Sequence, residues 1–133
     1  MRVRRLGTWL LALGVFAGLA WAMESTVVVT AHDDGRTLTL QKGQELELQL
    51  NANRSTGYGW TMALNPSPVL MQDGDPVYDP EETPGRIIGA GSVETWRFHA
   101  EQSGRRTLRM EYRRPWEREV PPAHVVTLRI VVE

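Results

Sequence analysis

The side chains that could carry out catalysis are few in this chain and are not spaced for it. The three histidines, His32, His99 and His124, lie far apart and show no metal-pair spacing. Ser55 and Thr56 carry hydroxyl groups, but no His or Lys stands nearby in the sequence to act as a base. The absence of cysteine excludes a cysteine nucleophile and a thiolate zinc site. We therefore expect a protein that is not an enzyme and that needs no cofactor or metal.

The acidic residues do not form a recognisable site either. Five of them fall in a proline-rich segment without the regularity of a calcium loop: Asp73, Asp75, Asp79, Glu81 and Glu82. A solvated loop is the better interpretation. No glycine-rich phosphate loop precedes a helix. Function is then expected in binding loops carried by a rigid scaffold.

One stretch combines glycines, small polar residues and aromatics as binding loops do. It runs from Asn53 to Trp60, with Gly57 and Gly59 permitting positive φ and close approach of another backbone. Two interpretations stay open, a hairpin turn whose aromatics close the end of a core, and a binding loop. We expect Trp60 to lie in the core, while Tyr58 is equally compatible with core and surface.

Two more segments read as exposed loops. Residues 85–92 hold five glycines or small residues around two adjacent isoleucines, which cannot both face the core of one strand. Residues 113–120 surround Trp116 with charged side chains, which favours its exposure. Below, residues 53–59, 85–92 and 113–120 are called loop 1, loop 2 and loop 3.

Alternating apolar and polar residues predict the strands that carry these loops. The clearest run is 45–50, where the leucines face inward and Glu45, Glu47 and Gln49 face water. Similar runs lie at 36–40, 93–100, 106–112 and 124–132, and Trp96 is assigned to the core. Two further strands are expected at 25–30, which is rich in β-branched residues, and at 59–64, which is largely apolar. Prolines exclude a long helix or central strand between 65 and 91, leaving short edge pieces near 69–71 and 76–78.

These strands predict an all-β sandwich, because there is no helical period of useful length. Alternate loops of a two-sheet sandwich cluster at the same end. Loops 1, 2 and 3 are separated by even numbers of strand passages if residues 65–84 count as one. They are therefore expected to share one end of a single domain.

The amino terminus predicts export. A basic segment with Arg2, Arg4 and Arg5 precedes an apolar run that ends in Ala20-Trp21-Ala22, as in a secretory signal peptide. The run is short of the ~20 residues that span a bilayer. We expect cleavage after Ala22, a domain over residues 23–133, and a periplasmic or secreted location. The alternative is a segment retained as an anchor.

Charge narrows the class of partner. Removing the three arginines of the leader leaves 12 basic residues against 16 acidic ones. A nucleic-acid partner would require a basic face, so none is expected. Without cysteines, the exported domain depends on its core for stability, and about 110 residues suffice for one such core, as a monomer.

Read together, the three loops resemble those of the chagasin-like inhibitors of papain-family cysteine proteases. The family pattern is N-P-T-T-G-Y/F, then G-x-G-G, then R-P-W/F. The matching residues here are Asn53, Arg54, Ser55, Thr56, Gly57 and Tyr58 in loop 1, Gly89, Ala90, Gly91 and Ser92 in loop 2, and Arg114, Pro115 and Trp116 in loop 3. Arg54 replaces the family's proline and Ser92 its last glycine. The resemblance covers essentially all of residues 23–133.

The resemblance implies an immunoglobulin-like β-sandwich with three binding loops at one end. It implies that loop 1 enters the protease cleft with Thr56 and Gly57 near the catalytic thiolate and histidine. Loop 2 would run along the non-primed side, and Trp116 in loop 3 would lie on the primed side. The expected function is reversible, tight inhibition of a papain-like cysteine protease. The alternative is a secreted module that binds a glycan or an envelope protein on a flat surface formed by Tyr58 and Trp116.

Overall fold

The chain forms two β-sheets packed face to face. The computed structural model describes residues 25–80 and 91–133, so the expected signal peptide and the greater part of loop 2, with Gly89 and Ala90, lie outside the described residues. The strands are β1 (Thr26–Thr30), β2 (Thr37–Leu40), β3 (Glu45–Asn51), β4 (Gly59–Leu64), β5 (Leu70–Gln72), β6 (Val77–Asp79), β7 (Val93–Ala100), β8 (Gly104–Arg113) and β9 (His124–Val132). Two short 3₁₀ helices, η2 (Ala31–Asp33) and η3 (Arg54–Thr56), complete the described elements.

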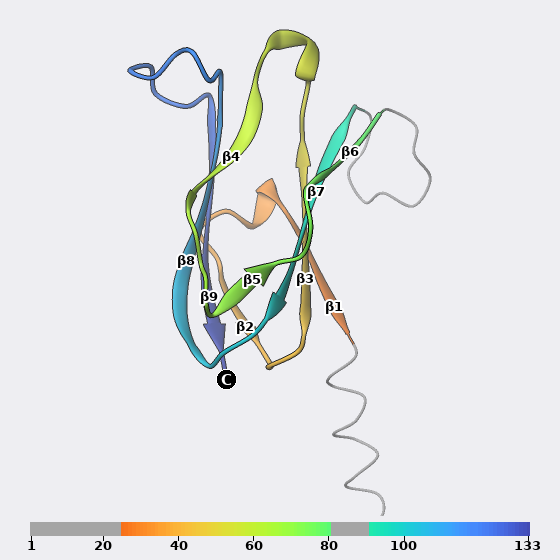
Figure 1. The fold of residues 1–133 in the computed structure, drawn as a ribbon, viewed down its shortest axis with the longest axis vertical. Helices are drawn as coiled ribbons and strands as arrows, with labels where there is room; N and C mark the ends of the chain where they lie inside the picture. Colours follow the sequence, from red (N-terminus) through yellow and green to blue (C-terminus); the bar gives the residue numbers. More distant parts are fainter. Residues whose placement is uncertain (1–24, 81–90) are drawn as a thin grey trace, which may run out of the picture.

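One sheet holds five of the described strands and the other holds four. One sheet has the order β1-β3-β7-β5, with β6 also paired to β7, and the other has the order β2-β9-β8-β4. The pairs β1/β3 and β2/β9 are parallel, and the remaining pairs are antiparallel. Figure 1 shows that the β3–β4 and β8–β9 connections lie at the same end of the sandwich, which we call the loop end. The predicted β-sandwich architecture is confirmed.

The core lies between the sheets and follows the predicted alternation. Leu46, Leu48 and Leu50 are at most 1% exposed, and Trp60 and Trp96 are also buried, as predicted. The remaining fully buried side chains include Phe98, Leu108, Met110, Leu128 and Ile130. The two edge pieces expected in the proline-rich region are β5 and β6, which both pair with β7. No helix among residues 25–80 and 91–133 is long and apolar enough to cross a membrane.

One predicted orientation is wrong. Gln49 was expected to face water, but it is 7% exposed. The reason is that β3 is an interior strand, and Gln49 has Thr30 of β1 on one side and Thr95 of β7 on the other. Period-two alternation identifies which side chains share a face, but it does not say whether the outer face is covered at a given position.

Candidate functional site: a braced loop surface

Loop 1 begins with a hydrogen-bonded turn built from its own residues. The Asn53 side-chain oxygen accepts from the backbone N–H of Ser55 at 3.2 Å and from its hydroxyl at 2.5 Å. The Thr56 hydroxyl donates to the backbone oxygen of Asn53 at 2.7 Å. Asn53 thereby caps η3, as short polar side chains do at helix starts. Gly57 ends η3 in the left-handed region, with φ 82°, and its N–H donates to the Arg54 oxygen at 3.1 Å.

Loop 3 braces loop 1 from a neighbouring connection. Nε of Arg114 donates to the backbone oxygen of Thr56 at 3.0 Å. The guanidinium carbon of Arg114 also lies 4.5 Å from the centroid of the Tyr58 ring, within cation–π range. The ring of Trp116 packs against Gly57, where a Cβ would collide with it. These contacts bring together five of the predicted site residues, Thr56, Gly57, Tyr58, Arg114 and Trp116.

The base of loop 1 is fixed by an aromatic cluster formed by Tyr58, Trp60 and Tyr112. The Tyr112 hydroxyl accepts from the backbone N–H of Asn53 at 2.8 Å. The Tyr112 ring stacks on Tyr58 with centroids 5.2 Å apart and lies 5.0 Å from Trp60. Nε1 of Trp60 donates to the Asn51 oxygen at 2.8 Å. A signal for Tyr112 was available, because a Tyr at the end of a core-facing run needs a partner for its hydroxyl.

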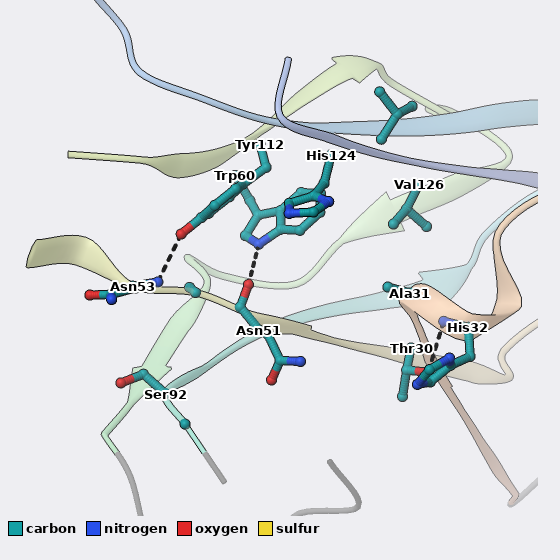
Figure 2. A pocket seen from close by; sticks show the side chains of 13 residues that line it. Thr30, Ala31, His32, Asn51, Asn53, Trp60, Ser92, Tyr112, His124 and Val126 are labelled. Carbon is teal, nitrogen blue, oxygen red and sulfur yellow. Dashed lines mark hydrogen bonds between the residues drawn. The ribbon is translucent and has the colours of Figure 1, made fainter. Parts of the chain in front are cut away.

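A cavity of about 590 Å³ opens below this cluster. Figure 2 shows Trp60, Tyr112 and His124 gathered on one side of it and Thr30, Ala31 and His32 of β1 and η2 on the other. The polar atoms of Trp60 and Tyr112 are bonded to the backbone of Asn51 and Asn53, as the dashed lines show. This wall of the cavity therefore supports the start of loop 1.

Loop 3 is closed at its own base by a charged chain of contacts. Nη1 of Arg113 donates to the backbone oxygen of Val120 at 3.0 Å, and its Nε and Nη2 donate to Glu111 at 3.1 and 3.0 Å. The hydrogen bond from Arg109, followed by that from Arg113, lowers the pKa of Glu111 below its ordinary value. Glu111 thus stays ionised and orients the arginine that joins both ends of the loop.

The described part of loop 2 adjoins loop 1. The backbone oxygen of Ser92 accepts from the N–H of Ala52 at 3.0 Å, which places Ser92 beside the start of loop 1. Gly91 has φ 110°, which favours glycine at that position. Gly89 and Ala90 lie outside the described residues. Ser92, which replaces a glycine of the family pattern, makes this contact through its backbone oxygen.

The exposed aromatics do not form a flat platform. Trp116 is 68% exposed, as its charged neighbours predicted, whereas Tyr58 is half-buried against Tyr112 and Arg114. Tyr58 therefore acts mainly as a support within the domain. Because the glycan-binding alternative requires Tyr58 and Trp116 to offer their faces together, the geometry disfavours it. Pro115 stands between Arg114 and Trp116 and fixes φ before the exposed ring.

Comparison with known proteins shows which sequences this chain is similar to. The sequence model described as chagasin family peptidase inhibitor I42 matches residues 39–130, which is well over half of the chain. Amoebiasin-2 of Entamoeba histolytica is 27% identical over 105 residues, covering 79% of this chain and 84% of its own. Chagasin of Trypanosoma cruzi is 27% identical over 92 residues, covering 66% of this chain and 81% of its own.

Solved structures agree in fold. The crystal structure of a cysteine protease inhibitor from Entamoeba histolytica is similar with a TM-score of 0.69 and 23% identity, covering 81% of this chain and 95% of that one. The solution structure of Amebosin has a TM-score of 0.60 and 28% identity, covering 80% and 98%. The match over residues 39–130 confirms the resemblance seen in the loops and the expectation of a protein that is not an enzyme: the chain belongs to the chagasin family of peptidase inhibitors.

Proposed function

We propose that this domain is a reversible, tight-binding inhibitor of papain-like cysteine proteases that occludes the active-site cleft with the loops at its loop end. One structural neighbour is described as a cysteine protease inhibitor, which supports the target class. The observation that carries the proposal is the bracing of loop 1 by loop 3, through Arg114 on the Thr56 oxygen and Trp116 on Gly57. A wedge fixed before binding loses little freedom on entering a cleft.

The geometry of loop 1 explains how it could occupy a protease without being cut. A protease attacks a carbonyl held in a near-attack position. In loop 1 the Thr56 oxygen is already bonded to Arg114, and the backbone turns through η3 into the left-handed Gly57. The carbonyl that would face the thiolate is therefore held in a turn, and its oxygen already accepts a hydrogen bond from Arg114. Gly57 meanwhile presents no side chain to a crowded cleft.

Loop 3 would supply the largest single contact. Trp116 is the most exposed large hydrophobic residue among those described, at 68%, and Trp, Tyr and Arg are the usual hot-spot types. With Pro115 restricting the backbone before it, the indole has little ordering cost to offset. A wedge of three loops would bury on the order of 1,600 Å² in total, with loop 2 contributing backbone contacts from Gly89 to Ser92.

We further propose that the domain acts after export, with residues 1–22 removed. The basic, then apolar, then small-residue order of the leader supports this. The absence of cysteine is compatible with it, because the twenty buried hydrophobic side chains of the core hold the described domain together. The periplasm and the outside of the cell are the two destinations.

The test is a titration of papain and of a cathepsin-L-like enzyme with the purified protein, using a fluorogenic substrate. The chain is expressed in full, and intact mass determines whether residues 1–22 have been removed. Reversible inhibition at nanomolar concentration, with the inhibitor uncut afterwards, is expected. Absence of inhibition at micromolar concentration by a folded protein would overturn the proposed target class.

A further inference from the structure

A buried carboxylate lies near the loop end, on the face of β7 that contributes to the core. Glu94 is 5% exposed, and it is in register with Leu50 of β3 and Tyr78 of β6. Its Oε1 accepts a 2.9 Å hydrogen bond from Nε1 of Trp96. Burying an ionisable group costs free energy, so its presence indicates a role beyond filling space. The bracing of loop 1 by loop 3 does not involve Glu94.

Arg54 of loop 1 reaches toward the same strand pair. Its guanidinium carbon lies 4.0 Å from the centroid of the Tyr78 ring, within the range of a cation–π contact. Tyr78 is the middle residue of β6 and is the register partner of Glu94. Burial raises the pKa of Glu94 above its ordinary value, while the hydrogen bond from Trp96 and the positive charge of Arg54 act in the opposite direction. Arg54 is therefore electrostatically coupled to Glu94.

We propose that Arg54 is a positioning residue for loop 1, holding its first turn against β6 through Tyr78, and that ionised Glu94 helps to keep it there. Linkage is reciprocal, so if Arg54 favours the ionised carboxylate, the ionised carboxylate favours Arg54 in place. This inference rests on the proposed function, because its main consequence is tighter inhibition. Arg54 stands where the family pattern has proline, whose ring restricts the backbone. In this chain the contact of the charged Arg54 with Tyr78 takes the place of that covalent restriction.

The coupling has a defined pH direction. Around Glu94 the neighbouring elements contribute Leu50 from β3, Tyr78 from β6, Arg54 from loop 1 and Trp96 from its own strand. Above its folded pKa, Glu94 is charged and Arg54 is held. As the pH falls through that pKa, Arg54 loses this attraction and inhibition weakens.

Protonation of Glu94 has the opposite effect on the stability of the fold: it weakens inhibition but stabilises the folded state. Because the folded pKa of Glu94 is raised, the folded state prefers the neutral form, and protonation stabilises it. Glu94→Gln should therefore weaken inhibition and increase resistance to urea at neutral pH. A residue with a merely structural role would not separate these two effects.

The experiment compares Arg54→Gln, Arg54→Lys and Glu94→Gln in the full chain, purified as the cell delivers it. Inhibition constants for papain are measured from about pH 5 to 7.5. Amide hydrogen exchange of Thr56 and Gly57 is measured in the free protein. Arg105→Gln is the matched control, because Arg105 is an exposed arginine near the start of β8, away from the loop end. Each constant is expressed as a ratio to the unaltered protein at the same pH, which cancels the protease's own titration.

We expect Arg54→Gln to weaken inhibition about tenfold at neutral pH and to speed exchange in loop 1, with Arg54→Lys restoring most of both. The ratio for Glu94→Gln should approach one as the pH falls. Unchanged exchange and inhibition in Arg54→Gln would overturn the inference while leaving the proposed function intact. If the unaltered protein inhibits neither papain nor the cathepsin-L-like enzyme, the proposed function fails, and faster exchange in Arg54→Gln would still support the positioning role.

Discussion

The indole of Trp116 packs against the backbone of Gly57, so closely that a Cβ at position 57 would collide with Cη2 and lie 3.3 Å from Cζ2 and Cζ3. Trp116 remains 68% exposed, because only part of its ring is used in this contact. Gly57 also has φ 82°. Two separate requirements for glycine, backbone conformation and space for loop 3, therefore coincide at one position.

Gly57→Ala should impair inhibition more than it impairs folding. The left-handed backbone costs an L-residue about 1 kcal/mol of unfolding free energy. The added methyl group should also displace Trp116 and move loop 3 away from loop 1. We expect inhibition of papain to weaken at least tenfold, since contacts of both loops would be lost. Titration with a fluorogenic substrate and urea unfolding give the two quantities.

Gly43→Ala is the matched control for this prediction. Gly43 has φ 85°, close to that of Gly57, but a Cβ there would meet nothing within 4 Å. It lies in the β2–β3 turn, away from the loop end. The loss of stability should be similar to that of Gly57→Ala, with an unchanged inhibition constant. Equal weakening of inhibition by both variants would show that the contact with Trp116 is not the cause.

Trp116→Ala should weaken binding to the protease without lowering the free energy of unfolding. The side chain is largely exposed, so its removal takes little buried area from the fold. Removing a hot-spot indole costs roughly 2 kcal/mol or more of binding free energy, about thirty-fold in the inhibition constant. Val120→Ala in the same loop is the control, because Val120 is 49% exposed and its backbone oxygen still accepts from Arg113. An inhibition constant unchanged in Trp116→Ala would remove loop 3 from the binding surface.

Tyr112→Phe tests the support beneath loop 1. The substitution keeps the ring that stacks on Tyr58 but removes the hydroxyl that accepts from Asn53 N–H. We expect unfolding free energy to fall by about 1 kcal/mol. Inhibition should weaken several-fold, because loop 1 must then be ordered on binding. Tyr58→Phe is the comparison for stability, since its described contacts are made by the ring. Unchanged exchange of the Asn53 amide in Tyr112→Phe would contradict the supporting role.

The strands, loop 1 and loop 3 could be predicted because each has a local signal in the sequence. Alternation placed Leu46, Leu48 and Leu50 in the core, and charged neighbours placed Trp116 at the surface. The contact of Arg114 with Thr56 could not be predicted, because it joins residues 58 positions apart and depends on how two connections meet in space. Such a contact leaves no period in the sequence.

The burial of two polar residues, Gln49 and Glu94, was also not predicted from the sequence. Gln49 was expected to face water because its neighbours in the alternating run do, and its burial follows from the strands on both sides of β3. Glu94 stands at a core-facing position of β7, where an apolar residue is usual. A charged residue at such a position is itself the sequence signal for a site, and Arg54, at a position where the family pattern has proline, is a second one.

The last prediction concerns pH and a cluster away from the loop end. Nδ1 of His99 lies 2.6 Å from Oδ1 of Asp73, and Nε2 lies 2.6 Å from Oε2 of Glu101. A neutral imidazole has one N–H and can donate to only one carboxylate, whereas the imidazolium donates to both. The hydrogen bond to Glu101, and then that to Asp73, raises the pKa of His99. The cluster joins the end of β5 to β7.

The sign of the effect follows from this raised pKa. The stabilisation is fully present below the unfolded pKa of histidine, about 6.5, and is lost as the pH rises through the higher folded pKa. The melting temperature of the unaltered protein should therefore exceed that of His99→Gln most near about pH 5.5, and the gap should narrow at alkaline pH. Inhibition should not change, because His99 lies near the end of β7 opposite the loops. A melting difference that is constant from acid to alkaline pH would show that His99 contributes packing alone, since packing does not titrate.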